Sequence, residues 1–196
     1  GVSIVEGSGS PIAPAELTWL LIMAAKRRLI QSVKGMQQGL WQTAIGQTVH
    51  GLKLGIIGYG KIGKRVAQFA KAFALDVEIL GSERAQKEAQ QDGFSIAKSR
   101  AEFFQSCDIV SVHLRLVKET EALIKFSDLI QMKKDALLVN ISRAELLENG
   151  ALFGALEQGF LGQVALDVYE NEPVYDPHHP LIQHPKVLCT PHIGYA

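Results

Sequence analysis

Short apolar runs alternate with amphipathic segments along most of the chain. The apolar runs have the length of β-strands and cover Leu52–Ile57, Val77–Leu80, Ile109–Leu114, Ala136–Ile141, Val164–Val168 and Val187–Thr190. Between them, the patterns predict helices over Lys61–Phe73, Arg84–Gln91 and Gly150–Gln158. Strands that are apolar throughout are typical of parallel sheets buried on both faces. The alternation therefore predicts an α/β fold built on a doubly wound parallel sheet.

The N-terminal part of the chain lies outside this alternation. Residues 7–14 have the composition of a loop, and a helix is predicted from Ala15 to a stop near Gly39. Pro11 and Pro14 lie near the start, and the other prolines lie from Pro173 onward. Because proline interrupts regular structure, residues 1–14 and 173–196 are expected to be connecting segments at the ends of one domain.

Composition and charge exclude several classes of protein. The 196 residues are 47% hydrophobic, and 20 Lys and Arg balance 20 Asp and Glu. A neutral chain lacks the basic surplus that non-specific nucleic-acid binding needs, and this hydrophobic content is too high for a disordered chain. Cys107 and Cys189 cannot form a disulfide framework, which favours the reducing cytoplasm. The longest nearly apolar run, Leu17–Ala25, is too short to cross a bilayer. We therefore expect a cytoplasmic protein without a nucleic-acid or membrane partner.

One loop is rich in histidine and carries His178, His179 and His184 near Asp176. Adjacent residues point in different directions, and no second cluster of metal ligands follows. We therefore expect a solvated loop here and no metal site.

Gly58, Tyr59, Gly60, Lys61, Ile62 and Gly63 form a G-x-G-x-x-G sequence between a predicted strand and a predicted helix. This is the context in which the motif binds a dinucleotide. Gly58 permits the tight turn, Gly60 lets a pyrophosphate approach the backbone, and Gly63 lets the helix pack closely on the strand. The N–H groups that begin the helix then face the phosphates. We interpret the chain as a Rossmann-type dinucleotide-binding domain; the alternative is a glycine-rich turn without a ligand.

The end of the second predicted strand bears on the choice of cofactor. An acidic residue there usually binds the adenosine ribose, but this position is Gly81. Ser82 and Arg84 follow it, and an arginine fork suits a 2′-phosphate, which favours NADP over NAD. In the alternative, Glu83 turns inward as the ribose acceptor and Arg84 lies in solvent.

Arg143, Glu172 and His192 each come shortly after one of the strand-like runs. The carboxyl ends of parallel strands form the edge where open α/β sheets bind ligands, so these side chains are expected to converge. Each also has a simpler interpretation: a surface arginine, a solvated glutamate, and a histidine that caps a backbone carbonyl.

Together, these three residue types suit hydride transfer to a 2-oxo acid. Arginine binds a carboxylate through two parallel hydrogen bonds. Histidine donates and accepts protons near neutral pH, as the carbonyl oxygen requires when hydride arrives. A neighbouring carboxylate favours the protonated imidazole and orients the ring.

The same motifs resemble those of the D-isomer-specific 2-hydroxyacid dehydrogenases. The matching segments are Gly55–Gly63, Asp108–Leu114, Asn140–Arg143, Leu166–Pro173 and Thr190–Tyr195, and together they span essentially the whole chain. The resemblance implies an NAD(P)-dependent oxidoreductase that acts on a small 2-oxo or 2-hydroxy acid. It implies that Arg143 binds the substrate, that His192 is the acid/base, and that Glu172 is its partner.

The resemblance also implies which residues surround the cofactor. These are Ser142 and Asp167 near the nicotinamide and His113, Leu114 and Arg115 on the adenosine side. The sequence departs from the family pattern at Arg115, where a proline is common, and at Val117, where a threonine or serine is common. Gly81 replaces the common acidic residue, which keeps NADP open.

Family members have two domains, with the cofactor domain inserted into a substrate domain. This chain resembles the insert alone, so we expect it to bind cofactor and to turn over poorly by itself. A homodimer is expected because the family's dimer contacts lie largely on the cofactor domain. The candidate contact is the helix from Ala15, where apolar side chains point to several sides: Leu17, Trp19, Leu20, Leu21 and Ile22.

The resemblance leaves a second function open, because the family includes transcriptional corepressors. The alternative is a dinucleotide-sensing binding protein that recruits a partner without significant turnover. Turnover in the full-length protein distinguishes this alternative from an enzyme.

Overall fold

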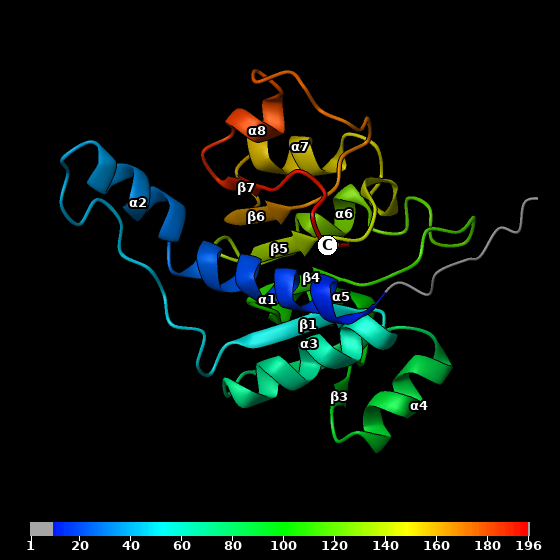
Figure 1. Ribbon diagram of the computed structural model, residues 1–196. Helices are drawn as coiled ribbons and strands as arrows, with labels where there is room; N and C mark the ends of the chain where they lie inside the picture. The colour runs from blue at the N-terminus through cyan, green and yellow to red at the C-terminus, as the bar shows by residue number, and fades with distance from the viewer. Residues whose placement is uncertain (1–9, 196) are drawn as a thin grey trace, which may run out of the picture.

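The computed structural model describes residues 10–195, and its centre is a seven-stranded sheet in the order β3-β2-β1-β4-β5-β6-β7 (Figure 1). Every pair of neighbouring strands is parallel. The strands are β1 (Lys53–Ile57), β2 (Asp76–Leu80), β3 (Ser95–Ile96), β4 (Ile109–Val112), β5 (Leu137–Asn140), β6 (Gln163–Leu166) and β7 (Val187–Cys189). The chain runs outward from β1 to β3 and then returns to β4 on the other side of β1. This order confirms the predicted doubly wound parallel sheet.

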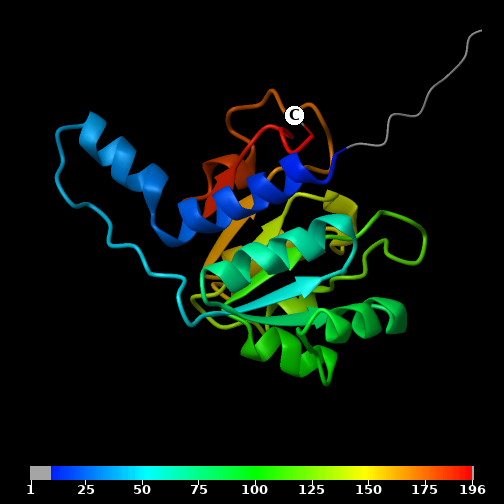
Figure 2. The same ribbon diagram turned by 60° about the horizontal axis from the view of Figure 1, so that its bottom comes forward.

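Helices cover both faces of the sheet. Their bounds are α1 (Ile12–Lys26), α2 (Leu29–Gln37), α3 (Lys61–Ala72), α4 (Glu83–Gln91), α5 (Arg100–Ser106), α6 (Phe126–Leu129), α7 (Ala151–Glu157) and α8 (Pro180–Gln183), with a 3₁₀ turn η1 (Ala144–Leu146). Helices α1 and α3 lie side by side over one face, as Figure 2 shows. On the opposite face, α5 packs under β1 and β2, and α6 packs against α7.

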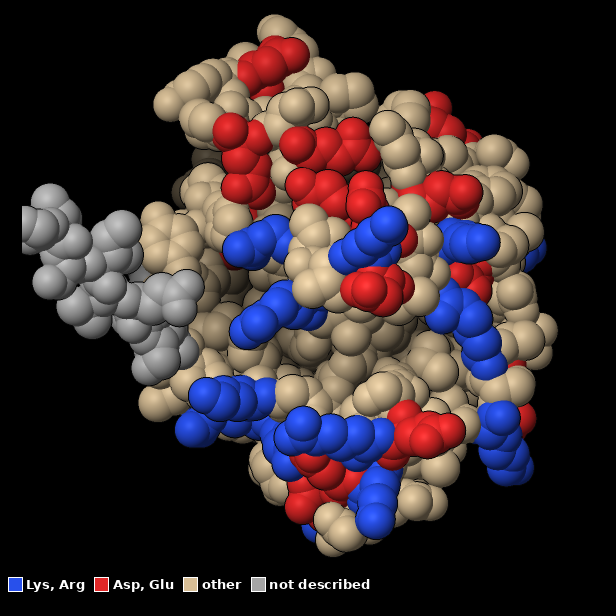
Figure 3. Space-filling model, turned by 90° about the vertical axis from the view of Figure 1, so that its right-hand side faces the viewer, with Lys and Arg blue, Asp and Glu red and all other residues tan. Residues whose placement is uncertain are grey.

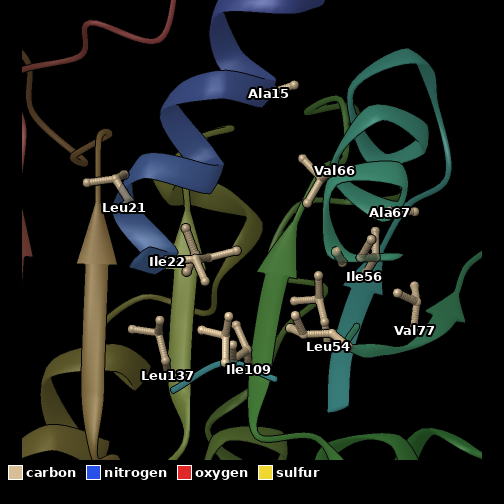
Figure 4. Packing of buried hydrophobic residues seen from close by; sticks show 14 of the residues in the cluster. Ala15, Leu21, Ile22, Leu54, Ile56, Val66, Ala67, Val77, Ile109 and Leu137 are labelled. Atoms are coloured by element: carbon tan, nitrogen blue, oxygen red, sulfur yellow. The ribbon is translucent and has the colours of Figure 1, made fainter. Parts of the chain in front are cut away.

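The core is divided by the sheet into two apolar clusters. Successive residues of a strand point to opposite faces, so Leu54 and Ile56 enter the cluster under α1 and α3, whereas Ile57 enters the other. Figure 4 shows the first cluster, in which Ile22 of α1 packs over Ile109 and Leu137. Burial on both faces explains why the strands are apolar throughout.

The N-terminal helix differs from its prediction. The helix expected from Ala15 to Gly39 is two helices, because Arg28 adopts a left-handed backbone conformation with φ 52° and ends the first. Leu17, Leu21 and Ile22 are buried rather than available for a partner chain. The helix is apolar on several sides because it packs on both α3 and the sheet. The expected connecting segment 173–196 contains α8 and β7, whereas residues 1–9 of the N-terminal one lie outside the described part of the chain.

Five short elements were not predicted: β3, α5, α6, η1 and α8, which contain two to seven residues each. A segment of that length shows too few repeats to reveal a period.

Within residues 10–195, no helix combines the length and hydropathy needed to cross a membrane.

Candidate active site and cofactor cleft

The carboxyl ends of the strands open onto a hollow surface. Figure 3 views the molecule from this side and shows basic and acidic side chains around a central depression, with acidic ones gathered above it. A cleft of about 810 Å³ lies here, lined by the ends of β1 and β2, the start of α3 and the loop after β4. This is the edge at which doubly wound sheets bind ligands.

The glycine loop forms one wall of the cleft between β1 and α3. Gly58 has φ +94°, and a Cβ there would lie 2.5 Å from the carbonyl oxygen of His113. A Cβ on Gly63 would lie 2.3 Å from the carbonyl oxygen of Gly58, so only glycine lets the helix approach this closely. At Gly60, by contrast, no described atom outside the adjacent chain lies within 4 Å of the Cβ position. The first and third glycines therefore shape the turn, and the second leaves open space.

The start of α3 suits a phosphate group. Gly60 is the N-cap, and no side chain among the described residues caps the helix. The open Cβ position at Gly60 and the uncapped N–H groups together fit a dinucleotide pyrophosphate. Lys61 is exposed on the cleft wall, whereas the Tyr59 side chain is buried and donates a hydrogen bond to Asp92 Oδ2 at 2.9 Å. Tyr59 and Ile62 thus pack into the fold and offer the cleft mainly their backbone.

Ser82 and Arg84 both line the cleft beyond the end of β2, whereas Glu83 is not among its lining residues. Ser82 is the N-cap of α4, and its Oγ accepts the Ala85 N–H at 3.4 Å. The Arg84 side chain is 89% exposed, and its Nε lies 2.9 Å from Glu88 Oε1. The structure thus places both predicted phosphate-binding side chains on the cleft wall.

The loop after β4 forms the opposite wall, with His113, Leu114 and Arg115 among its lining residues. Arg115 is exposed, and His113 is buried, with Nε2 lying 2.8 Å from Ser111 Oγ. Burial lowers the pKa of His113 to about 3, so the ring is neutral at ordinary pH. His113 therefore shapes the wall and carries no charge to the cleft.

Arg143, Glu172 and His192 meet in a second, smaller pocket of about 220 Å³. They come from the segments that follow β5, β6 and β7, as the sequence predicted from the strand ends. Arg143 is exposed, and its Nη1 donates to the carbonyl oxygen of Ser142 at 2.6 Å. The pocket thus brings one cation and one imidazole together with Glu172, and Glu145 and Glu170 also line it.

Glu172 and His192 are directly hydrogen bonded, with Nδ1 and Oε2 2.5 Å apart. The other carboxylate oxygen accepts the Tyr169 N–H at 2.8 Å. Partial burial alone would raise the pKa of Glu172. The hydrogen bonds from His192 and Tyr169 and the charges of His192 and Arg143 outweigh it, so the pKa lies below its ordinary value. Glu172 is therefore a carboxylate at neutral pH. It binds only Nδ1 of His192, so the other ring nitrogen, Nε2, is not used by this pair.

Asp167 fixes the turn that carries His192. Asp167 is fully buried, and its Oδ1 accepts the Thr190 hydroxyl at 2.6 Å and the Ile193 N–H at 3.0 Å. Its Oδ2 accepts the Gly194 N–H at 2.8 Å. These bonds hold His192 in a left-handed conformation with φ 51°. Asp167 thus acts as a positioning residue in this structure, and its place near the nicotinamide stays a prediction.

Ser142 is bonded within the protein in a similar way. Its Oγ donates to the carbonyl oxygen of Val112 at 2.8 Å, and its N–H donates to Asn140 Oδ1 at 3.0 Å. These bonds tie the end of β5 to the end of β4. They hold the segment that carries Arg143 in place, and the contact of Ser142 with the nicotinamide stays a prediction.

Sequence reasoning missed several cleft residues, which include Lys64, Glu88, Arg100 and Thr120. Two of them had a signal: Lys64 directly follows the last glycine of the motif, and Glu88 lies one helical turn after Arg84.

No group of three or more His, Cys, Asp or Glu side chains within residues 10–195 is arranged to hold a metal ion.

The strand order, the glycine loop and the cleft at the carboxyl edge define a Rossmann-type dinucleotide-binding domain. The family model for the D-isomer specific 2-hydroxyacid dehydrogenase NAD binding domain matches residues 19–194. The chain therefore belongs to the D-isomer specific 2-hydroxyacid dehydrogenase family and is an NAD-binding domain of that family.

Similar proteins include reductases and dehydrogenases. A glyoxylate reductase from Aeropyrum pernix is 38% identical over 94% of this chain and 57% of its own length. A D-3-phosphoglycerate dehydrogenase from Bacillus subtilis is 34% identical over 99% of this chain and 37% of its own length. A crystal structure of a phosphoglycerate oxidoreductase from Vibrio cholerae is 46% identical, with TM-score 0.95, over 100% of this chain and 64% of its own. The chain thus spans about 37–57% of the two curated relatives.

Proposed function

We propose that this chain is the cofactor domain of an NAD(P)-dependent oxidoreductase that reduces small 2-oxo acids to D-2-hydroxy acids. The observation that carries the proposal is the meeting of Arg143, Glu172 and His192 in one pocket. This pocket lies at the same edge of the sheet as the cleft formed by the glycine loop. The glyoxylate reductase and the phosphoglycerate dehydrogenase among the similar proteins support this substrate class.

The three side chains divide the work of the reaction. A reduced nicotinamide bound in the cleft would supply the hydride. Arg143 binds the substrate carboxylate through its guanidinium group and fixes the carbonyl beside His192. His192 donates a proton from Nε2 to the carbonyl oxygen, where negative charge develops. Glu172 accepts the hydrogen bond from Nδ1, which keeps Nε2 directed to the substrate and stabilises the imidazolium.

We further propose NADP as the preferred cofactor. Ser82 and Arg84 line the cleft beyond β2, where the adenosine ribose binds in this fold, and Glu83 is not among its lining residues. Gly81 supplies no carboxylate to accept hydrogen bonds from the ribose hydroxyls. Replacing Arg84 with Ala is expected to weaken NADPH binding far more than NADH binding.

A substrate domain is part of this proposal, because the curated relatives extend well beyond the matched region. Closure of a second domain over the cleft would exclude water from the site, as hydride transfer requires. Cytoplasmic location is likewise proposed, from the composition and the two cysteines, neither of which forms a disulfide.

A homodimer is also proposed, through a surface that we call the α2 surface. It consists of exposed apolar side chains on α2 and the segment after it: Leu29, Ile30, Val33, Met36, Leu40, Trp41 and Ile45. Exposed large apolar side chains gathered on one helix and its adjoining segment are typical of protein–protein contacts. Of the contact expected on α1, Leu20 is exposed, whereas Leu17, Leu21 and Ile22 are buried, so the α2 surface is the larger candidate.

The test is steady-state turnover of the full-length protein with glyoxylate, hydroxypyruvate and pyruvate, followed by cofactor absorbance. We expect reduction to the D-2-hydroxy acid. Replacing Arg143 with Gln is expected to raise KM and lower kcat/KM, because the carboxylate loses its bidentate partner. Cofactor binding without turnover of any 2-oxo acid would contradict the proposal and favour the dinucleotide-sensing alternative.

A further inference from the structure

Two cations meet at one carboxylate on the wall of the cofactor cleft. Glu88 of α4 lies with Oε2 2.9 Å from Lys64 Nζ of α3 and with Oε1 2.9 Å from Arg84 Nε. Each oxygen of the carboxylate is therefore paired with a different cation. A second carboxylate, that of Asp92, lies 3.8 Å from Lys64 Nζ and is itself hydrogen bonded by Tyr59.

This cluster lies where the 2′-position of the adenosine ribose is expected. Lys64, Arg84 and Glu88 line the same cleft as Ser82, which follows the end of β2. The Lys64 and Arg84 side chains are 40% and 89% exposed, so both can reach a ligand. The side chains of Lys64 and Arg84 therefore bind the Glu88 carboxylate and also line the cleft.

All three groups are charged at neutral pH. The hydrogen bond from Lys64, followed by that from Arg84, holds the pKa of Glu88 below its ordinary value. The hydrogen bond to Glu88 raises the pKa of Lys64 and that of Arg84. Glu88 is thus an anion that is paired with the same two cations, Lys64 and Arg84, that a phosphate in the cleft would bind.

We propose that Lys64 joins Ser82 and Arg84 in binding the 2′-phosphate of NADP, and that Glu88 is the internal counter-ion displaced by this phosphate. The inference rests on the proposed function. Glu88 keeps both cations beside the cleft when no phosphate is bound, and it competes with the phosphate for the same donors. It therefore sets how strongly the site distinguishes NADP from NAD.

The test compares two ligands that differ only by the 2′-phosphate: adenosine 2′,5′-bisphosphate and AMP. Calorimetry on the full-length protein at one low salt concentration gives both affinities. Replacing Glu88 with Gln is expected to tighten binding of the bisphosphate about fivefold, the upper end of what an exposed ion pair contributes, and to leave AMP unchanged. Replacing Lys64 with Gln is expected to weaken the bisphosphate about fivefold, again without an effect on AMP.

Glu102→Gln is the matched control, because Glu102 forms a similar exposed pair with Lys98, 3.8 Å away, outside the cleft. It should change neither affinity. Thermal unfolding of each variant checks that the fold is retained. Weaker or unchanged bisphosphate binding in Glu88→Gln would overturn the inference, as would equal effects of Lys64→Gln on both ligands. If the wild-type protein binds both ligands but the substitutions leave the ratio of the two affinities unchanged, the inference fails and the proposed function stands. If the wild-type protein binds neither ligand, the proposed function fails as well.

Discussion

His192 owes its position to two acidic neighbours, both from the segment that follows β6. Glu172 binds its Nδ1, while Asp167 holds the backbone on its far side through the N–H groups of Ile193 and Gly194. A left-handed conformation is uncommon for a residue with a side chain and is maintained only by such contacts. The protein itself thus fixes the orientation of the ring, as the proposed acid/base role requires.

We predict that replacing His192 with Gln in the full-length protein lowers kcat by roughly 10²–10⁴, the usual contribution of a positioned acid/base. Cofactor affinity should stay nearly unchanged, because His192 lies in the smaller pocket and does not line the cofactor cleft. Stopped-flow or steady-state turnover and calorimetry measure the two quantities. His178→Gln, in an exposed loop, is the control. Turnover that is equal in the His192 and His178 variants would remove His192 from the mechanism.

The charge of Glu172 makes a prediction about pH. The proposed reduction takes its proton from His192, so activity depends on how well the surroundings of this ring stabilise the imidazolium. The pKa of Glu172 lies below its ordinary value, so its negative charge is present throughout the neutral range and supports the imidazolium. Replacing Glu172 with Gln removes this charge, and the high-pH limb of the kcat/KM profile should move to lower pH.

The matched control for this shift is Glu157→Gln, which removes the carboxylate from another glutamate–histidine pair, 3.9 Å from His184. It should leave the profile unchanged. A profile that does not move in Glu172→Gln would show that Glu172 plays no part in protonating His192.

At this scale, the sequence predicted the residues at strand ends and missed those that depend on packing. Arg143, Glu172 and His192 follow apolar runs, and the common edge of a parallel sheet brings such residues together. The pairing of Lys64 with Glu88 was not predicted, because it joins two helices whose relative placement depends on the whole fold. The bonds of Asp167 likewise depend on the path of a turn.

At the scale of elements, β1 shows how one residue sets the distance between a strand and a helix. Gly55 lies on the face covered by α5, and a Cβ there would lie 2.5 Å from Phe103 Cζ and 2.6 Å from Cys107 Sγ. The glycine therefore lets α5 pack directly on the strand that leads into the glycine loop.

We predict that replacing Gly55 with Ala lowers the free energy of unfolding by about 1–3 kcal/mol, because the added methyl group overpacks the core. Denaturant titration measures the change. A second substitution, Phe103→Leu, should recover part of the loss, since it removes the ring atoms that the methyl group would contact. If the losses in the free energy of unfolding of Gly55→Ala and Phe103→Leu simply add in the double variant, this account of Gly55 is contradicted.

The strands buried in the sheet were predictable, whereas the edge strand β3 and four short helical elements were not. The strands β1, β2, β4, β5, β6 and β7 all fall within predicted runs or one residue beyond them, because burial on both faces leaves an apolar signature. The break between α1 and α2 was missed, since the Lys26-Arg27-Arg28 run is compatible with the polar face of a continuous helix. Its cause is the left-handed backbone of Arg28, which no apolar period reveals.

At the scale of the whole molecule, the α2 surface leads to a prediction about assembly. Its exposed members include Met36 at 57% and Trp41 at 76%. Replacing both with Asp should convert a homodimer into a monomer, because charge opposes burial of this surface. Light scattering or sedimentation measures the mass. Tyr175→Asp, at another exposed aromatic residue, is the control and should leave the mass unchanged. A wild-type monomer would contradict the proposed homodimer.

The central claim is that the cleft beside the glycine loop binds a nicotinamide dinucleotide, and calorimetric titration of the chain with NADPH and NADH at one salt concentration tests it most directly. The informative variant is Gly60→Val. No described atom outside the adjacent chain lies within 4 Å of the Cβ position, so the new side chain would stand where a pyrophosphate approaches. We predict binding of both cofactors, tighter for NADPH, and loss of both in the variant at unchanged thermal stability. Absence of binding to the wild-type chain, or binding that Gly60→Val leaves intact, would contradict the claim.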